Sequence, residues 1–375
     1  MNIAQRTQRI KRAFSYSKRA KVEDSSITIT PFCFTQQVGK QEVDEVQRRL
    51  EPTDFCSTTD DHIQENKSFQ YVIFAPESAH RHEDAIVLLH GLNERSWEKY
   101  LTWAEYLVKS TGKPVILFPL AFHMNRTPAQ WSNPRFALPW VAARKQVVPD
   151  LQNSTFVNVV LSSRLASQPL RFYTSGLESV YNLIQLTGEL KNGDHPLFAK
   201  DCSMNIFAYS IGALVAQVLL LANPKKLFED TRLFMFCGGS VFSEMNGSAR
   251  DIMDAAANDC IHRYYLERFL QTENTSNGLE QAFKMMLHTD FMSNERQVFF
   301  HGAQNRIKVV SLQQDTVVPT HGIVSALGEI SKDVVEELDF PFSYSHQTPF
   351  PTNPKAGELV EHAFEEVFGR AAAFL

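Results

Sequence analysis

Cysteine is scarce in this chain of 375 residues, and its placement argues against several kinds of site. The five cysteines are odd in number and scattered, with no C-x-x-C pair and no zinc-ligand spacing: Cys33, Cys56, Cys202, Cys237 and Cys260. We therefore expect neither a disulfide framework nor a structural zinc site. Scattered cysteines are typical of buried, reduced thiols, which predicts a cytoplasmic protein.

Long apolar runs and a large excess of one charge are also missing. The best apolar run, residues 214–222, is far shorter than the roughly 20 residues that a membrane-spanning helix needs, so no stable membrane insertion is expected. The net charge of -5 gives no reason to expect nucleic acid as a partner. The sequence contains no H-E-x-x-H pattern and no Walker loop, so we predict no metal site and no cofactor.

The first 22 residues carry seven Lys or Arg side chains and no acidic residue. No apolar segment follows them, which argues against a secretory signal peptide. The stretch partly fits an organellar transit peptide, but we prefer a solvated basic start or a surface helix. Residues 1–66 as a whole are polar and irregular, and we predict an N-terminal extension there. Residues 27–34 alternate and are a candidate edge strand, which suits Pro31.

From residue 67 onward, short apolar runs alternate with amphipathic stretches. Strands are predicted at residues 69–75, 85–89, 114–120, 204–208, 233–237, 306–312 and 334–340. Helices are predicted at residues 94–109, 170–190, 213–222, 320–328 and 356–368. This alternation predicts an α/β protein with a mostly parallel central sheet and helices on both faces.

Two stretches interrupt the alternation. Residues 122–169 are rich in proline and have little periodicity, which is typical of an insertion or a functional segment. Residues 241–296 are helical in character, with helical spacing at residues 249–257, 262–270 and 279–287. The predicted core therefore comprises residues 67–240 and 297–375.

One serine stands at a predicted strand-to-helix turn. In the segment FAYSIG, residues 207–212, Ser210 follows an apolar strand and precedes a helix, with Ala208 and Gly212 as small neighbours. A strained turn of this kind exposes the serine hydroxyl and leaves the first helical N–H groups free. The usual form is G-x-S-x-G, and here Ala208 replaces the first glycine. Alone, the motif does not distinguish a nucleophile from an ordinary turn serine.

Candidate partners for Ser210 come later in the chain. Asp315 follows the predicted strand 306–312, at the carboxyl end where open α/β sheets place functional side chains. His346 follows the last predicted strand. A histidine within reach would take the serine proton, and a carboxylate would hold the ring in the required tautomer. Other candidates for the base and the acid are less well placed, and His90 suits bracing of its turn instead. The remaining rivals are His262, His288, His301, His321, Asp290 and Asp339.

These features, in the order Ser210, Asp315, His346, resemble the α/β-hydrolase superfamily over residues 71–375. The strand 85–89, which ends in His-Gly-Leu-Asn before a helix, resembles the oxyanion loop of the same superfamily. The resemblance implies an α/β-hydrolase fold with residues 241–296 as a helical lid. It also implies an oxyanion hole made by the N–H groups of Ile211 and of Leu92 or Asn93.

The implied activity is that of a serine hydrolase that cleaves a small-molecule ester or amide without a cofactor. His123, Asn125 and Arg126 follow the strand 114–120 and, with Asn93, are candidates to bind a polar or anionic part of the substrate. Alternatively, the first three tie their loop to the body of the protein. Three other functions stay open: a catalytically inactive binding protein on this scaffold, an acyltransferase or peptidase, and a carbon–carbon hydrolase with the same triad.

Overall fold

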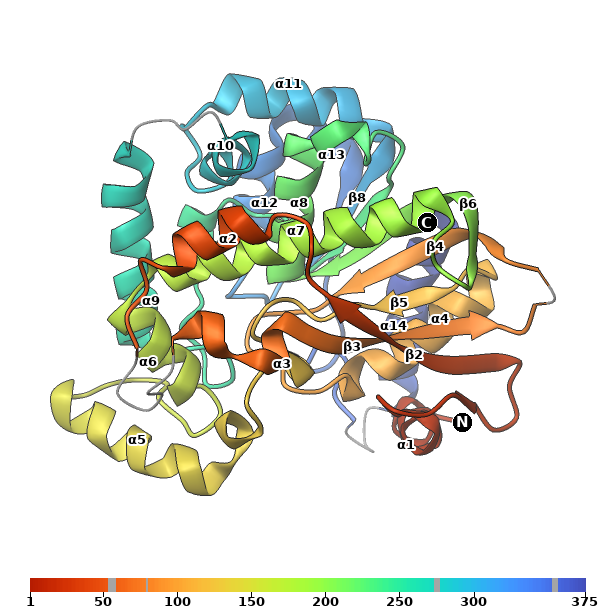
Figure 1. Ribbon diagram of the computed structural model, residues 1–375, viewed down its shortest axis with the longest axis horizontal. Helices are drawn as coiled ribbons and strands as arrows, with labels where there is room; N and C mark the ends of the chain where they lie inside the picture. Colours follow the sequence, from red (N-terminus) through yellow and green to blue (C-terminus); the bar gives the residue numbers. More distant parts are fainter. Residues whose placement is uncertain (53–58, 79, 273–276, 353–356) are drawn as a thin grey trace.

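The computed structural model describes residues 1–52, 59–78, 80–272, 277–352 and 357–375, and within them nine strands form one sheet (Figure 1). The strand order across the sheet is β1-β2-β3-β5-β4-β6-β7-β8-β9. The strands are β1 Ala20–Lys21, β2 Ile27–Thr35, β3 Ser68–Pro76, β4 His82–Leu89, β5 Val115–Leu117, β6 Phe198–Tyr209, β7 Leu233–Phe236, β8 Ile307–Leu312 and β9 Val335–Leu338. The pairs from β5 to β9 are parallel, and β1, β2 and β3 add an antiparallel edge.

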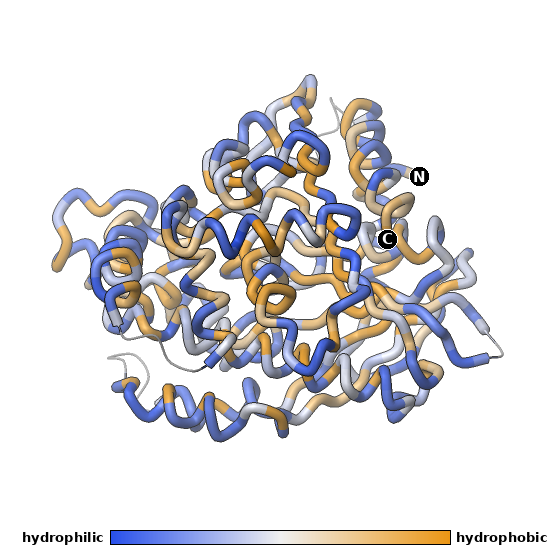
Figure 2. Tube along the Cα trace, turned by 90° about the horizontal axis from the view of Figure 1, so that it is seen from above, coloured by the Kyte–Doolittle hydropathy of each residue, from blue (hydrophilic) through white to orange (hydrophobic). Residues whose placement is uncertain are grey.

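Helices cover both faces of the sheet. Three of them bury one face: α1 Ile3–Ala13, α4 Leu101–Thr111 and α14 Gly357–Phe374. The other face packs against α2 Lys40–Gln47, α7 Leu170–Asn192, α8 Ile211–Ala222, α9 Ala255–Arg263, α10 Gly278–Met285, α11 Ser293–Ala303, α12 Thr320–Leu327 and α13 Ser331–Val334. In the view from above, hydrophobic residues concentrate in the centre and hydrophilic ones at the periphery (Figure 2).

The side chains of strand β6 pack into the hydrophobic cores on both faces of the sheet. Side chains alternate along a strand, so Phe207 and Tyr209 pack with α4 and α14, whereas Ile206 and Ala208 face the α7 and α8 side. Such two-sided burial explains the near-continuous apolar runs in the sequence. Ser210 comes directly after β6 and before α8.

The mostly parallel sheet, the helices on both faces and the strand–serine–helix turn after β6 constitute the α/β-hydrolase fold, which confirms the predicted fold class. All seven core strands are present, although β5 is shorter than predicted and β6 begins six residues earlier, at Phe198 rather than at residue 204. The helix predicted at residues 94–109 begins only at Leu101, because the preceding residues form a turn in which Glu94 accepts a hydrogen bond from Tyr100. The candidate edge strand is β2, which pairs with β3 along its length and with the two-residue β1.

The two interrupting stretches contain short helices. Residues 122–169 hold α5 Pro134–Val147 and α6 Val159–Ser167, and part of this stretch packs into a small separate core around Trp131 and Val159. In residues 241–296, the helix expected from residue 249 begins at Ala255. The domain boundaries, including the lid at residues 241–296, stay predictions.

The basic start and the cysteines take defined places. The start forms helix α1, in which Arg6 and Arg9 pair with Glu361 and Glu105. Buried thiols were expected, and Cys202 and Cys237 are buried, but Cys33 is exposed at the edge in β2 and Cys260 is half-buried. Cys56 lies outside the described residues. The cytoplasmic location stays a prediction.

A search of the described helices finds none with the length and apolar character to cross a membrane. Across the described ranges, His, Cys, Asp and Glu side chains form no group of three or more that could hold a metal ion.

Candidate active site

Ser210 has the strained backbone that a sharp strand-to-helix turn requires. Its φ is 56° and its ψ is -122°, a region that residues other than glycine rarely adopt. Strain of this kind persists only where the surrounding structure enforces it. Strand β6 on one side and helix α8 on the other supply that constraint, so the Ser210 hydroxyl projects from the apex of the turn.

Close backbone contacts explain the small residues around Ser210. A Cβ atom added to Gly212 would lie 2.8 Å from Leu89 Cβ and 3.0 Å from the carbonyl oxygen of His90. A Cβ atom on Gly238 would lie 2.6 Å from Ala213 Cβ. The absence of a side chain at Gly212 lets the start of α8 pack directly against the end of β4, and at Gly238 it lets the chain after β7 approach α8. Ala208 is fully buried in the pairing of β6 with its neighbours, where a methyl group is accommodated.

The three residues predicted as a triad lie together. Ser210 Oγ is 2.7 Å from His346 Nε2, and His346 Nδ1 is 2.7 Å from Asp315 Oδ2. All three are buried, with at most 5% of each residue exposed. The carboxylate accepts a hydrogen bond from Nδ1–H, which leaves Nε2 free to accept the serine proton. The chain brings the groups from the β6–α8 turn, the β8–α12 loop and the β9–α14 loop.

Further contacts hold this arrangement. Asp315 Oδ1 accepts hydrogen bonds from the backbone N–H groups of Val317 and Val318, both at 2.9 Å. The ring of Tyr209 stacks on the His346 ring at 5.4 Å, and its hydroxyl donates to the His346 carbonyl. Burial, and then the Asp315 charge, raises the pKa of Cys237, which leaves a neutral thiol beside the carboxylate.

The rival residues have other partners. His90 braces its turn as expected, because its Nδ1–H donates to Gly91 and its Nε2 accepts from the Leu120 N–H. His321 lies on the surface beside Glu244. Asp339 accepts hydrogen bonds from Tyr344 and Gln314.

Leu92 and Ile211, whose backbone N–H groups are predicted to form an oxyanion hole, lie beside Ser210. Ile211 is the first residue of α8, so its N–H has no intrahelical acceptor. Within the described part of the chain, neither Ile211 nor Leu92 has an acceptor for its backbone N–H. Leu92, Ser210 and Ile211 line one small cavity. Tyr100 holds the loop before Leu92, because its hydroxyl accepts from the Gly91 N–H at 3.0 Å.

Asn93 and His123 line one cavity, together with Leu92. Asn93 Nδ2 donates to the carbonyl groups of Val157 and Asp251, so its side chain ties the loop after β4 to two other segments. His123 is 7% exposed, and its Nδ1–H donates to the Ala121 carbonyl at 2.8 Å. Its Nε2 is a buried atom without a hydrogen-bond partner among the described residues. Burial lowers the pKa of His123 to about 4, so the ring is neutral at pH 7.

Arg126 fits the alternative role, that of a tie for its loop, and its prediction as a substrate-binding residue is corrected, whereas that of Asn125 stays a prediction. Asn125 Nδ2 donates to the Gln70 carbonyl. Arg126 is fully buried and forms an ion pair with Glu178 at 3.0 Å, two hydrogen bonds to Asn66 and one to the Pro119 carbonyl. A guanidinium that is engaged in this way is not presented to a substrate.

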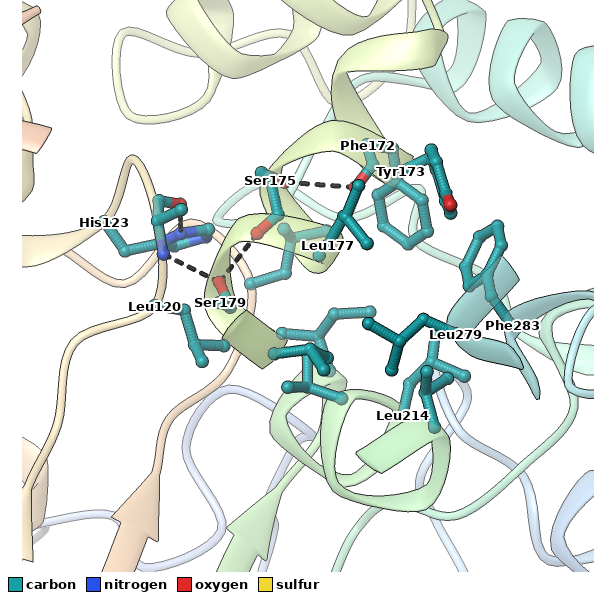
Figure 3. Close-up of a pocket in the computed structure, with 17 residues that line it drawn as sticks. Leu120, His123, Phe172, Tyr173, Ser175, Leu177, Ser179, Leu214, Leu279 and Phe283 are labelled. Atoms are coloured by element: carbon teal, nitrogen blue, oxygen red, sulfur yellow. Dashed lines mark hydrogen bonds between the residues drawn. The ribbon is translucent and has the colours of Figure 1, made fainter. Parts of the chain in front are cut away.

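An apolar pocket lies beside the cavity that contains Ser210 (Figure 3). Its walls come from α7, α8, α10 and the loop after β5. Leu92, Phe172 and Ile211 line both spaces, so the pocket and the Ser210 cavity meet at these residues. The pocket walls are mostly apolar.

Sequence reasoning missed Tyr209, Tyr100 and the apolar pocket. Tyr209 and His346 are 137 positions apart, and nothing local to either one indicates their contact. The apolar spacing of residues 170–190 predicted a helix but not that part of it would border a cavity. One sequence signal was available for Tyr209. Side chains alternate between the two faces of a strand, so Tyr209, next to Ser210, lies on the face of the sheet opposite to that of Ala208.

Comparisons with known proteins give a family and several structural likenesses. The sequence model of a family described as "Family of unknown function (DUF6051)" matches residues 1–375. No curated protein matches the chain in sequence. The carboxyl esterase 2 (TmelEST2) from the mycorrhizal fungus Tuber melanosporum is 8% identical with a TM-score of 0.44, covering 100% of this chain and 98% of that chain.

Two further structures give similar values. Acetyl xylan esterase 1 from Thermoanaerobacterium sp. JW/SL YS485 is 12% identical with a TM-score of 0.44, covering 98% of this chain and 93% of that chain. Vibralactone cyclase is 10% identical with a TM-score of 0.46, covering 100% of this chain and 85% of that chain. The fold assignment rests on the strand order and pairing described above.

Proposed function

The chain belongs to the family of unknown function DUF6051, and we propose that it is a serine hydrolase that cleaves a small-molecule ester through an acyl-enzyme intermediate. The observation that carries this proposal is the pair of 2.7 Å hydrogen bonds that link Ser210 to His346 and His346 to Asp315. A serine hydroxyl is a weak nucleophile at neutral pH and needs a base in this position. The strained backbone of Ser210 adds support, because such strain concentrates at functional sites.

In the proposed acylation, Ser210 Oγ attacks the ester carbonyl carbon while its proton passes to His346 Nε2. The new Oγ–C bond turns the carbonyl oxygen into an oxyanion, which the N–H groups of Leu92 and Ile211 bind. One such donor is typically worth about 3–4 kcal/mol in the transition state. Asp315 stabilises the imidazolium that forms. The intermediate collapses when the C–O bond to the alcohol breaks and His346 gives its proton to the leaving oxygen.

Deacylation repeats these steps with water as the nucleophile. His346 takes a proton from the water as its oxygen attacks the acyl carbon. The second tetrahedral intermediate collapses, the Oγ–C bond breaks, and His346 returns the proton to Ser210. The products are a carboxylic acid and an alcohol, and the enzyme regains its starting state.

The alternative of an inactive binding protein has less support, because an imidazole aimed at the serine and oriented by a carboxylate is not needed for binding alone. An acyltransferase, peptidase or carbon–carbon hydrolase would use the same first steps, and the acceptor or the scissile bond would differ. The apolar pocket beside Ser210 favours an ester with an apolar acyl group.

A panel of chromogenic esters of increasing acyl length tests the proposal. We expect the wild-type protein to hydrolyse at least one of them and the variant Ser210→Ala to lose several orders of magnitude in kcat. Ser203→Ala is a matched control, because Ser203 lies on the same strand and is exposed. Hydrolysis that survives in Ser210→Ala at the rate of the control would overturn the proposal.

A further inference from the structure

The pocket beside the Ser210 cavity is lined mostly by apolar side chains, as small-molecule sites are. Ile211 follows Ser210 directly in the chain, and with Leu92 and Phe172 it borders both the pocket and the Ser210 cavity. A group that is covalently bound to Ser210 Oγ therefore lies next to the pocket, with these three side chains at the boundary. Figure 3 shows the pocket extending from Leu120 at one end to Phe283 at the other.

Gly176 keeps part of this space open. It lies in the interior of α7, a helix of 23 residues, where glycine costs about 1 kcal/mol relative to alanine. A Cβ atom added to Gly176 would meet no atom within 4 Å, so no close neighbour requires a glycine there. Gly176 lines the pocket, and a larger side chain at this position would occupy it. The glycine therefore leaves room that packing alone does not explain.

His123 lies at the Leu120 end of the pocket, near Ser175 and Ser179 (Figure 3). Its Nδ1–H is used by the Ala121 carbonyl, so Nε2 carries a lone pair and accepts hydrogen bonds. Among the described residues, no donor reaches this atom. A buried acceptor without a partner is costly, and a donor on a bound molecule would satisfy it.

We propose that this pocket takes the acyl group of the substrate, and that this group is an unbranched apolar chain with a hydroxyl that donates to His123 Nε2. The inference rests on the proposed function, since it assigns the substrate class of the same serine. The apolar walls select the chain, and the acceptor distinguishes a hydroxylated chain from a plain one.

General values for hydrophobic burial and for hydrogen bonds give the expected changes in kcat/KM. Each additional buried methylene is expected to raise kcat/KM about fourfold, until the pocket is full. One hydrogen bond to His123 is expected to favour a hydroxylated chain over the plain chain about tenfold.

The experiment compares nitrophenyl esters of acetate, butanoate, hexanoate and octanoate, and of hydroxyhexanoates with the hydroxyl at each carbon in turn. The variant Gly176→Leu should lower the ratio of hexanoate to acetate kcat/KM at least tenfold. Gly188→Leu is its matched control on the same helix, because Gly188 also has nothing within 4 Å but does not line the pocket. We expect that control to keep the wild-type ratio. His123→Leu should remove the hydroxyl preference and keep the chain-length preference.

Binding to Ser210→Ala separates this inference from the proposed function. Calorimetry should show that methyl hexanoate binds to Ser210→Ala and that adding Gly176→Leu weakens this binding at least tenfold, whether or not the wild type hydrolyses esters. Ser210-dependent hydrolysis with the same chain-length profile in Gly176→Leu and Gly188→Leu would overturn the pocket assignment alone. Equal rates for plain and hydroxylated hexanoates at every hydroxyl position would overturn the role of His123.

Discussion

Removal of the Glu178 charge tests whether Arg126 is a structural residue, as its contacts indicate. The side chains of Arg126 and Glu178 are 0% and 1% exposed, and their charges are 3.0 Å apart. In Glu178→Gln the guanidinium loses its counter-ion without access to water. Breaking one side of such a buried pair typically costs 3–5 kcal/mol. The new amide oxygen can still accept from Asn66, which bonds Glu178 at 2.7 Å, so we expect a loss of about 3 kcal/mol in the free energy of unfolding.

The assay is urea unfolding of wild type and variants under identical conditions. Glu336→Gln is the matched control, because the Glu336–Arg370 pair is about one-third exposed and its loss should cost less than about 1 kcal/mol. The double variant Glu178→Leu with Arg126→Leu removes both charges and should recover stability relative to Glu178→Gln. Equal, small losses in Glu178→Gln and Glu336→Gln would refute the structural role of Arg126.

Three further predictions concern the site. Gly212→Ala should lower kcat in the ester assay at least tenfold, because its methyl group would push the start of α8 away from the His90 carbonyl, and an unchanged kcat would contradict this packing. Asp315→Asn should lower kcat by orders of magnitude with KM little changed, since His346 loses the partner that fixes its tautomer, and a wild-type kcat would remove Asp315 from the triad. Burial lowers the pKa of His123 from 6.5 to about 4, so the unfolded chain binds a proton in this window that the folded chain does not. The free energy of unfolding should therefore fall as the pH drops from 6.5 to 4, by up to about 3 kcal/mol from this residue, and His123→Leu should show a shallower pH dependence in denaturant titrations.

The fold and the triad were predictable because their signals are local and ordered along the chain. Apolar runs marked each core strand, and a parallel sheet brings the ends of its strands to one edge. Ser210, Asp315 and His346 each follow such a run, so their order and position were enough to place them together. The helix start at Leu101 was missed because Glu94 and Tyr100 interact within a turn that hydrophobic spacing does not register.

The role of Arg126 depends on a partner 52 positions away, which no local pattern reveals. A charged residue in a loop after a strand looks the same in the sequence whether it faces a ligand or a buried carboxylate. The same holds for His123, since only its burial and its bond to Ala121 show that its Nε2 is an acceptor with no donor among the described residues. Burial and long-range pairing therefore decided what the sequence left open.

Labelling with a fluorophosphonate is the most direct test of the central claim, which is that Ser210 is a nucleophile activated by His346. Mass spectrometry of the intact protein and of its peptides should find one adduct per chain, on Ser210. Labelling should be absent in Ser210→Ala and strongly slowed in His346→Gln. A folded wild-type protein that stays unlabelled, or an adduct on another residue that persists in Ser210→Ala, would contradict the claim.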